Sequence, residues 1–105
     1  MSAVPYEKLE RLVQRWDEIR AELNRGPKPA VFAQLSKEFA DLDPLVGTIR
    51  ALQKANAERD DLVALQNDPA TEKELAELAR DELDGVTEKI AGLEHELKIQ
   101  LIPKD

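Results

Sequence analysis

Residues 67–75, NDPATEKEL, form the clearest boundary in the sequence. Asp68 before Pro69 has the pattern of an N-cap followed by the first residue of a helix. Thr71 and Glu74 offer a competing capping box, in which two residues three apart cap the helix reciprocally. Either arrangement predicts that one helix ends before this stretch and that another begins within it.

The chain after this boundary has the pattern of a long amphipathic helix that extends to Leu101. Apolar residues recur at the spacings of a single helix face. They are Leu75, Ala79, Leu83, Val86, Ile90, Leu93 and Leu97. Gly85 and Gly92 each cost about 1 kcal/mol of helix propensity. They either mark a close approach between helices or are tolerated as a mild weakening of the helix.

The chain before the boundary predicts a second helix over residues 30–66, with Pro44 as its difficulty. The apolar residues Leu35, Phe39, Leu42, Val46 and Ile49 share one face, and leucines continue the pattern less regularly. Proline inside a helix removes a hydrogen bond and costs about 3 kcal/mol. The stripe stays in phase across Pro44. We therefore expect a helix that is bent or tightly broken here, with Asp43 as N-cap if it breaks.

A third stripe occupies residues 5–25, where Leu9, Leu12, Trp16, Ile19 and Leu23 follow the heptad rhythm. Gly26 and the sequence GPKP then predict a turn. Three stripes joined by short turns predict one all-α domain over residues 1–105, an antiparallel three-helix bundle. The side chains expected to be largely buried are Leu9, Trp16, Leu23, Phe39, Val46, Val86, Ile90 and Leu93.

The composition excludes several classes of protein. The chain has no Cys, so it has neither disulfides nor thiolate chemistry. Its net charge of −7 argues against a domain that binds nucleic acid over its whole surface. No apolar run is long enough for a membrane span or a signal peptide. We expect a cytoplasmic protein.

No catalytic, cofactor-binding or metal-binding residues are predicted. His95 is the only histidine and has no nucleophile nearby in the sequence, so we expect a surface residue. Trp16 is expected to be a core anchor, with an interface anchor as the alternative. An acidic row shares one face of the third helix, and it is expected to face solvent or a basic partner. It consists of Glu77, Asp81, Asp84 and Glu88.

Several stretches together resemble the amino-terminal helical domain of bacterial class-I peptide chain release factors. They are KLERLVQRWDEIRAELN (residues 8–24), LSKEFADLDPLV (35–46), NDPATEKELAELARDEL (67–83) and LEHELKIQLIPKD (93–105). The resemblance covers essentially the whole chain. The most specific elements are ELARDEL and LIPKD at their distance from each other. The LIPKD ending resembles the type-one factor, which reads UAG and UAA.

The resemblance implies an accessory domain of a protein that promotes translation termination. In the family, the chain continues beyond the Pro-Lys-Asp motif into domains that read the stop codon and carry a Gly-Gly-Gln loop. This sequence has no Gly-Gly pair, so we expect no hydrolytic activity from it. The implied partners are the ribosome at the stalk base of the large subunit and the recycling GTPase. No membrane, cofactor or small-molecule substrate is implied.

Two other classes of function are open. One is a free-standing coiled-coil adaptor or chaperone module. The other is the helical arm of an aminoacyl-tRNA synthetase, which would need a basic stripe for tRNA phosphates. Residues 72–98 have nine acidic and four basic side chains, which counts against tRNA.

The uneven charge predicts which surface faces ribosomal RNA. The acidic row should be repelled by phosphates and should face solvent or a basic protein. Any surface near RNA should instead contain the basic residues Arg11, Arg15, Arg20, Arg25 and Lys28.

Overall fold

The computed structural model describes residues 4–103 and contains three helices in this range, with no strand. They are α1 (Tyr6–Asn24), α2 (Pro29–Asn67) and α3 (Lys73–Gln100), with 19, 39 and 28 residues. The predicted all-α class is confirmed, and each helix begins and ends close to where its stripe does. Lys104 and Asp105, which close the LIPKD motif, lie outside the described residues.

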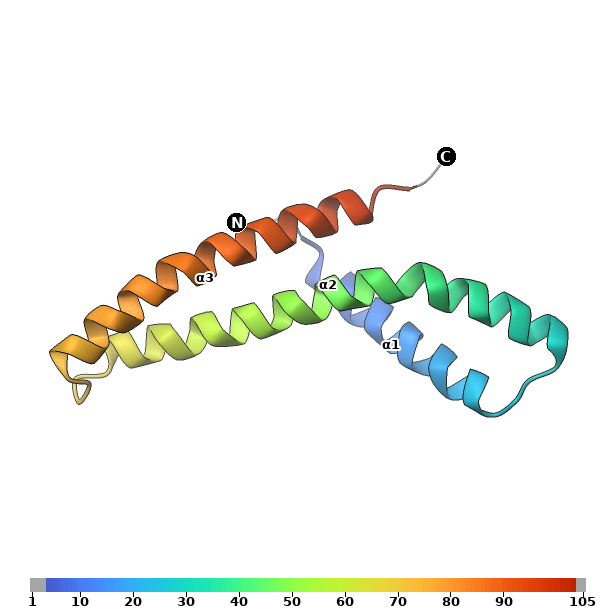
Figure 1. Ribbon diagram of the computed structural model, residues 1–105, viewed down its shortest axis with the longest axis horizontal. Helices are drawn as coiled ribbons and strands as arrows, with labels where there is room; N and C mark the ends of the chain where they lie inside the picture. Colours follow the sequence, from blue (N-terminus) through green and yellow to red (C-terminus); the bar gives the residue numbers. More distant parts are fainter. Residues whose placement is uncertain (1–3, 104–105) are drawn as a thin grey trace. The chain divides into compact units, whose positions relative to one another are not determined.

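The chain divides into two compact units, and the division falls inside α2. The first unit extends to Ile49, and the second begins at Arg50. In the first unit α1 packs against the N-terminal part of α2, and in the second α3 runs beside the C-terminal part of α2 (Figure 1). Short turns join the paired helices, so each pair is an antiparallel hairpin, as the three-stripe pattern predicts.

Apolar stripes form the core of each hairpin. In the first unit the buried apolar residues are Val4, Leu9, Trp16, Ile19, Val46 and Ile49. In the second they are Leu52, Ala55, Leu62, Ala79, Val86, Ile90 and Leu97. The spacings in α3 are seven, four and seven, which is the heptad rhythm expected for a helix pair. Three side chains that were expected to be buried, Leu23, Phe39 and Leu93, are only half-buried.

The helix α2 continues through Pro44 without interruption. The predicted alternative of a break, with Asp43 as N-cap, is therefore wrong, whereas a bend at this position stays a prediction. Proline has no N–H, so the carbonyl group of residue 40 has no donor four residues later. The Thr48 hydroxyl donates a hydrogen bond to the Pro44 carbonyl oxygen at 3.3 Å, within the turn that follows. The helix therefore continues in register beyond the proline.

The two turns differ in how closely they follow the sequence signals. At the first turn, Gly26 adopts a left-handed φ of 69°, which is the conformation that favours glycine after a helix. Its N–H donates to the Leu23 carbonyl oxygen at 3.2 Å, so the predicted stop is confirmed.

At the second turn, both capping predictions are wrong. The N-cap of α3 is Glu72, and no side chain caps the helix. Asp68 instead accepts a hydrogen bond from the Ala70 N–H at 2.9 Å, while the Thr71 N–H donates to the Asp68 carbonyl oxygen at 3.1 Å. The Asp-Pro pair therefore builds the turn itself rather than the start of the helix.

Gly85 and Gly92 do not mark a close approach between helices. A Cβ atom added at either position would meet no heavy atom within 4 Å. Of the two interpretations of these glycines, the structure favours a tolerated weakening of α3.

Candidate interaction surface

The first unit contains a polar cluster around Trp16 that holds α1 to α2. The indole ring is 9% exposed and stacks on Phe39, with ring centroids 5.4 Å apart. Its Nε1–H donates to the Asp43 carboxylate at 3.0 Å, and the Arg20 guanidinium lies 4.7 Å from the ring centroid. This confirms Trp16 as a core anchor, because its apolar face is packed and its single donor is satisfied.

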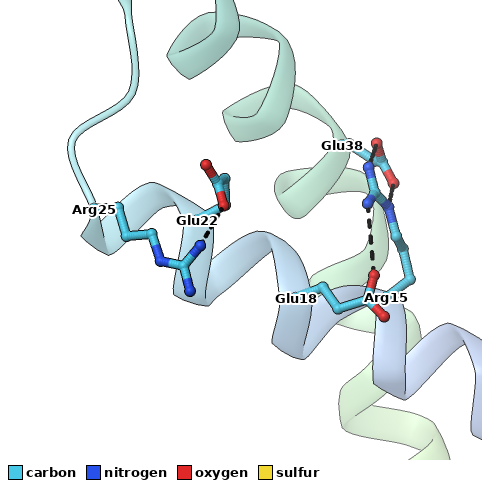
Figure 2. Close-up of polar contacts among 5 residues, drawn as sticks. All are labelled: Arg15, Glu18, Glu22, Arg25 and Glu38. Atoms are coloured by element: carbon cyan, nitrogen blue, oxygen red, sulfur yellow. Dashed lines mark hydrogen bonds and ion pairs between the residues drawn. The ribbon is translucent and has the colours of Figure 1, made fainter.

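An ion pair joins the same two helices on the exposed side. Arg15 donates two hydrogen bonds to Glu38, at 2.6 and 2.9 Å, and its guanidinium lies 3.8 Å from Glu18 (Figure 2). Hydrogen bonding to Arg15 lowers the pKa of the Glu38 carboxyl below its ordinary value, and burial opposes this effect. Two parallel N–H···O contacts give the pair a defined geometry, which favours a fixed spacing of α1 and α2 here.

Pairing of this kind occupies three of the five basic residues that were predicted to face RNA. Arg25 pairs with Glu22 (Figure 2), with nitrogen and oxygen 3.2 Å apart, and Arg20 lies 3.5 Å from Asp17. With Arg15, these arginines are already matched by carboxylates of the first unit. Arg11 and Lys28 are exposed and form no ion pair within residues 4–103, so they are the cations of this group available to a phosphate.

The acidic row lies on the surface as predicted. Glu77, Asp81, Asp84 and Glu88 are all exposed, and none forms an ion pair in the described part of the chain. His95 is also exposed, as expected. Within residues 4–103, no group of three or more His, Cys, Asp or Glu side chains has the arrangement required to hold a metal ion.

Two exposed leucines near the start of α3 were not anticipated. Leu75 is 45% exposed although it continues the apolar stripe, because it lies at the end of the hairpin, just after the turn that follows α2. Leu78 is 54% exposed and lies one position before the buried Ala79. The exposure of Leu78 could be predicted from the sequence, because Leu78 does not lie on the apolar stripe of α3.

None of the helices in residues 4–103 combines the length and hydrophobicity needed to cross a membrane.

The chain is similar in sequence to known proteins. Residues 6–105 match the family described as the PCRF domain. The chain is 40% identical over all of its 105 residues to "Peptide chain release factor 1" of Rhizobium rhizogenes. It covers 29% of the length of that relative. No solved structure is significantly similar.

The match to the family and the identity to this relative extend through both units and all three helices. The chain belongs to the PCRF domain family.

Proposed function

We propose that this chain acts in translation termination, as the PCRF domain of a peptide chain release factor that works on the ribosome in the cytoplasm. The observation that carries the proposal is its similarity, over its full length, to a protein named peptide chain release factor 1. The same similarity favours this role over a free-standing adaptor or the arm of a tRNA synthetase. The UAG- and UAA-reading type is part of the proposal.

We propose further that residues 1–105 work as a single domain. The family match, over residues 6–105, spans the boundary at Ile49 and Arg50. The helix α2 belongs to both units and is continuous across this boundary.

The domain is proposed to bind rather than to catalyse. Nucleophilic and general-base chemistry needs a nucleophile and a base within hydrogen-bonding reach of each other. The chain has no Cys, and its single histidine, His95, is exposed and has no hydrogen-bond partner in the described residues. The partners we propose are the ribosome, at the stalk base of the large subunit, and the GTPase that recycles the factor.

A release assay tests these proposals. The chain is added to ribosomes stalled at a UAA codon with labelled peptidyl-tRNA, and we expect no peptide release at any concentration. The chain is then titrated against release factor 1 of Rhizobium rhizogenes, and we expect it to slow release by competing for the ribosome.

The two parts of this assay test two separate proposals. Release by the chain alone would overturn the proposal that it does not catalyse. Unchanged release at a large molar excess of chain would overturn direct binding to the ribosome. An unrelated acidic helical bundle of the same net charge serves as the control, and it should leave the rate of release unchanged.

A further inference from the structure

The exposed leucines of α3 form a small apolar surface on one helix face. Leu75 and Leu78 are three residues apart, so their side chains are neighbours on the helix. They are 45% and 54% exposed. Removing this exposed apolar area from water would favour binding, so the two leucines offer a partner a small apolar contact.

Carboxylates border this surface. The helical neighbours of Leu78 three and four residues away are Leu75, Glu74, Asp81 and Glu82. The three carboxylates are exposed, and none takes part in an ion pair or hydrogen bond among residues 4–103. Within residues 4–103 their negative charge is not neutralised by an ion pair, in contrast to the charges of Arg15 and Arg20 in α1.

The net charge of the whole second unit has the same negative sign as these three carboxylates. From Arg50 onward the chain has 14 acidic and 8 basic residues, so this unit carries nearly all of the net charge of −7. A surface of this sign attracts cations and repels both RNA phosphates and a second copy of the same surface.

We propose that this surface of α3 binds a basic amphipathic helix of a partner protein. The apolar face of such a helix would cover Leu75 and Leu78, while Lys or Arg side chains at its borders would pair with Glu74, Asp81 and Glu82. This is the common mode in which an amphipathic helix binds an apolar surface, with complementary charges along the rim. The surface extends the proposed function by specifying the chemistry of one partner, and it can be tested without the ribosome.

The test uses the purified chain and a synthetic helical peptide that has a leucine face bordered by lysines, with binding followed by fluorescence anisotropy. We expect Leu78→Gln to weaken binding about tenfold, because it removes the central apolar contact. Glutamine has good helix propensity, so α3 should keep its circular dichroism spectrum. Asp81→Asn with Glu82→Gln should also weaken binding and should flatten its dependence on salt.

Matched controls separate this surface from general attraction to an acidic protein. Asp84→Asn with Glu88→Gln makes the same charge change on the same helix, roughly 9–15 Å from Leu78 along the helix axis. It should change the affinity by less than about twofold. Phe32→Gln removes an apolar side chain that is 50% exposed in the other unit, and it should leave binding unchanged.

Four results would overturn the proposal. The first is equal affinity of the Leu78→Gln variant and the unaltered chain. The second is equally tight binding of a peptide with the same lysines but serines in place of its leucines. The third is self-association of the chain in sedimentation equilibrium that Leu78→Gln abolishes, which would identify a second copy as the occupant. The fourth is tighter binding of an RNA hairpin than of the peptide at this surface.

Discussion

Trp16 is the residue on which the first unit depends most. It combines a stacked ring, a hydrogen bond to Asp43 and the charge of Arg20 above its face. Each of these contacts joins the indole to a different side chain, and two of the three partners lie on α2. Because the ring is large and nearly inaccessible to solvent, small shifts of neighbouring side chains cannot fill the cavity that its removal leaves.

We therefore expect Trp16→Ala to lower the free energy of unfolding by about 3–5 kcal/mol, as large-to-small substitutions in a core do. Trp16→Phe keeps most of the apolar area but removes the donor to Asp43, and it should cost only about 1 kcal/mol. Urea denaturation followed by circular dichroism measures both values. A Trp16→Ala variant as stable as the unaltered chain would place this side chain outside the core.

Glu38 should make the stability of the first unit depend on pH in the acid range. Its pKa is lowered in the folded chain by hydrogen bonding to Arg15. The contribution of the pair is therefore complete above the ordinary glutamate pKa of about 4.3, and it is lost as the pH falls through the lower, folded value. Both side chains are substantially exposed, so salt should weaken the effect.

The measurement compares the free energy of unfolding of the chain with that of Glu38→Gln between pH 2 and pH 7 (roughly the range over which carboxylates titrate). The unaltered chain should be the more stable of the two at neutral pH, and the difference should shrink on acidification. Glu18→Gln is the matched control, because its oxygen is 3.8 Å from Arg15 and makes no hydrogen bond to it. A difference that stays constant down to pH 2 would contradict the role assigned to the Arg15 pair.

At the scale of the elements, the helices differ in how far their sequences favour helix formation. The helix α2 tolerates Pro44 in its interior, and α3 tolerates Gly85 and Gly92. In each case the apolar stripe stays in register across the unfavourable residue. Burial of the stripe against the neighbouring helix therefore outweighs the local preference.

Gly85→Ala and Gly92→Ala should each raise the free energy of unfolding by up to about 1 kcal/mol, the difference in helix propensity between glycine and alanine. The structure leaves room for the added methyl group at both positions, because nothing lies within 4 Å of it. Gly26→Ala is the contrasting variant and should destabilise the chain, since φ is 69° there. Thermal unfolding distinguishes the three variants, and destabilisation by both helical substitutions would show that these glycines have a packing role.

At the scale of the whole chain, charge separates two kinds of surface. In the first unit most arginines are paired with neighbouring carboxylates, whereas the carboxylates that border Leu78 in the second unit form no ion pair with residues 4–103. Substitution of Arg15 would therefore disrupt the contact between α1 and α2 as well as any contact with RNA. Arg11 and Lys28 provide a cleaner test of the predicted RNA-facing surface, because they are exposed and have no ion pair in residues 4–103.

We expect Arg11→Glu with Lys28→Glu to weaken binding of the chain to ribosomes and to flatten its salt dependence, because fewer counterions are released from RNA. Ribosome affinity measured at several salt concentrations gives both quantities. Lys54→Glu with Lys89→Glu makes the same charge change at exposed positions of the second unit and should have a smaller effect. Equal losses of ribosome affinity in the two double variants would show that only the net charge of the chain matters.

The sequence by itself determined the helices, their approximate ends and the residues at the centre of each stripe. Leu9, Trp16, Val46, Val86 and Ile90 could be assigned to the core because the period of an amphipathic helix is a local property of the chain. The turn at Gly26 could be predicted for the same reason, since only the conformation of a single residue is involved. The family could also be recognised, because whole stretches of sequence carry the resemblance.

The tertiary structure decided which polar side chains meet and which apolar ones stay exposed. Asp43 is a plausible N-cap in sequence, yet it accepts the indole hydrogen bond of Trp16, 27 residues away. Arg15 belongs to the basic residues predicted to lie nearer any RNA-facing surface, and the structure pairs it with Glu38 across the hairpin. Leu75 continues the stripe but is exposed, because it lies where the hairpin ends. These outcomes depend on the register of one helix against another, and no local pattern encodes that register.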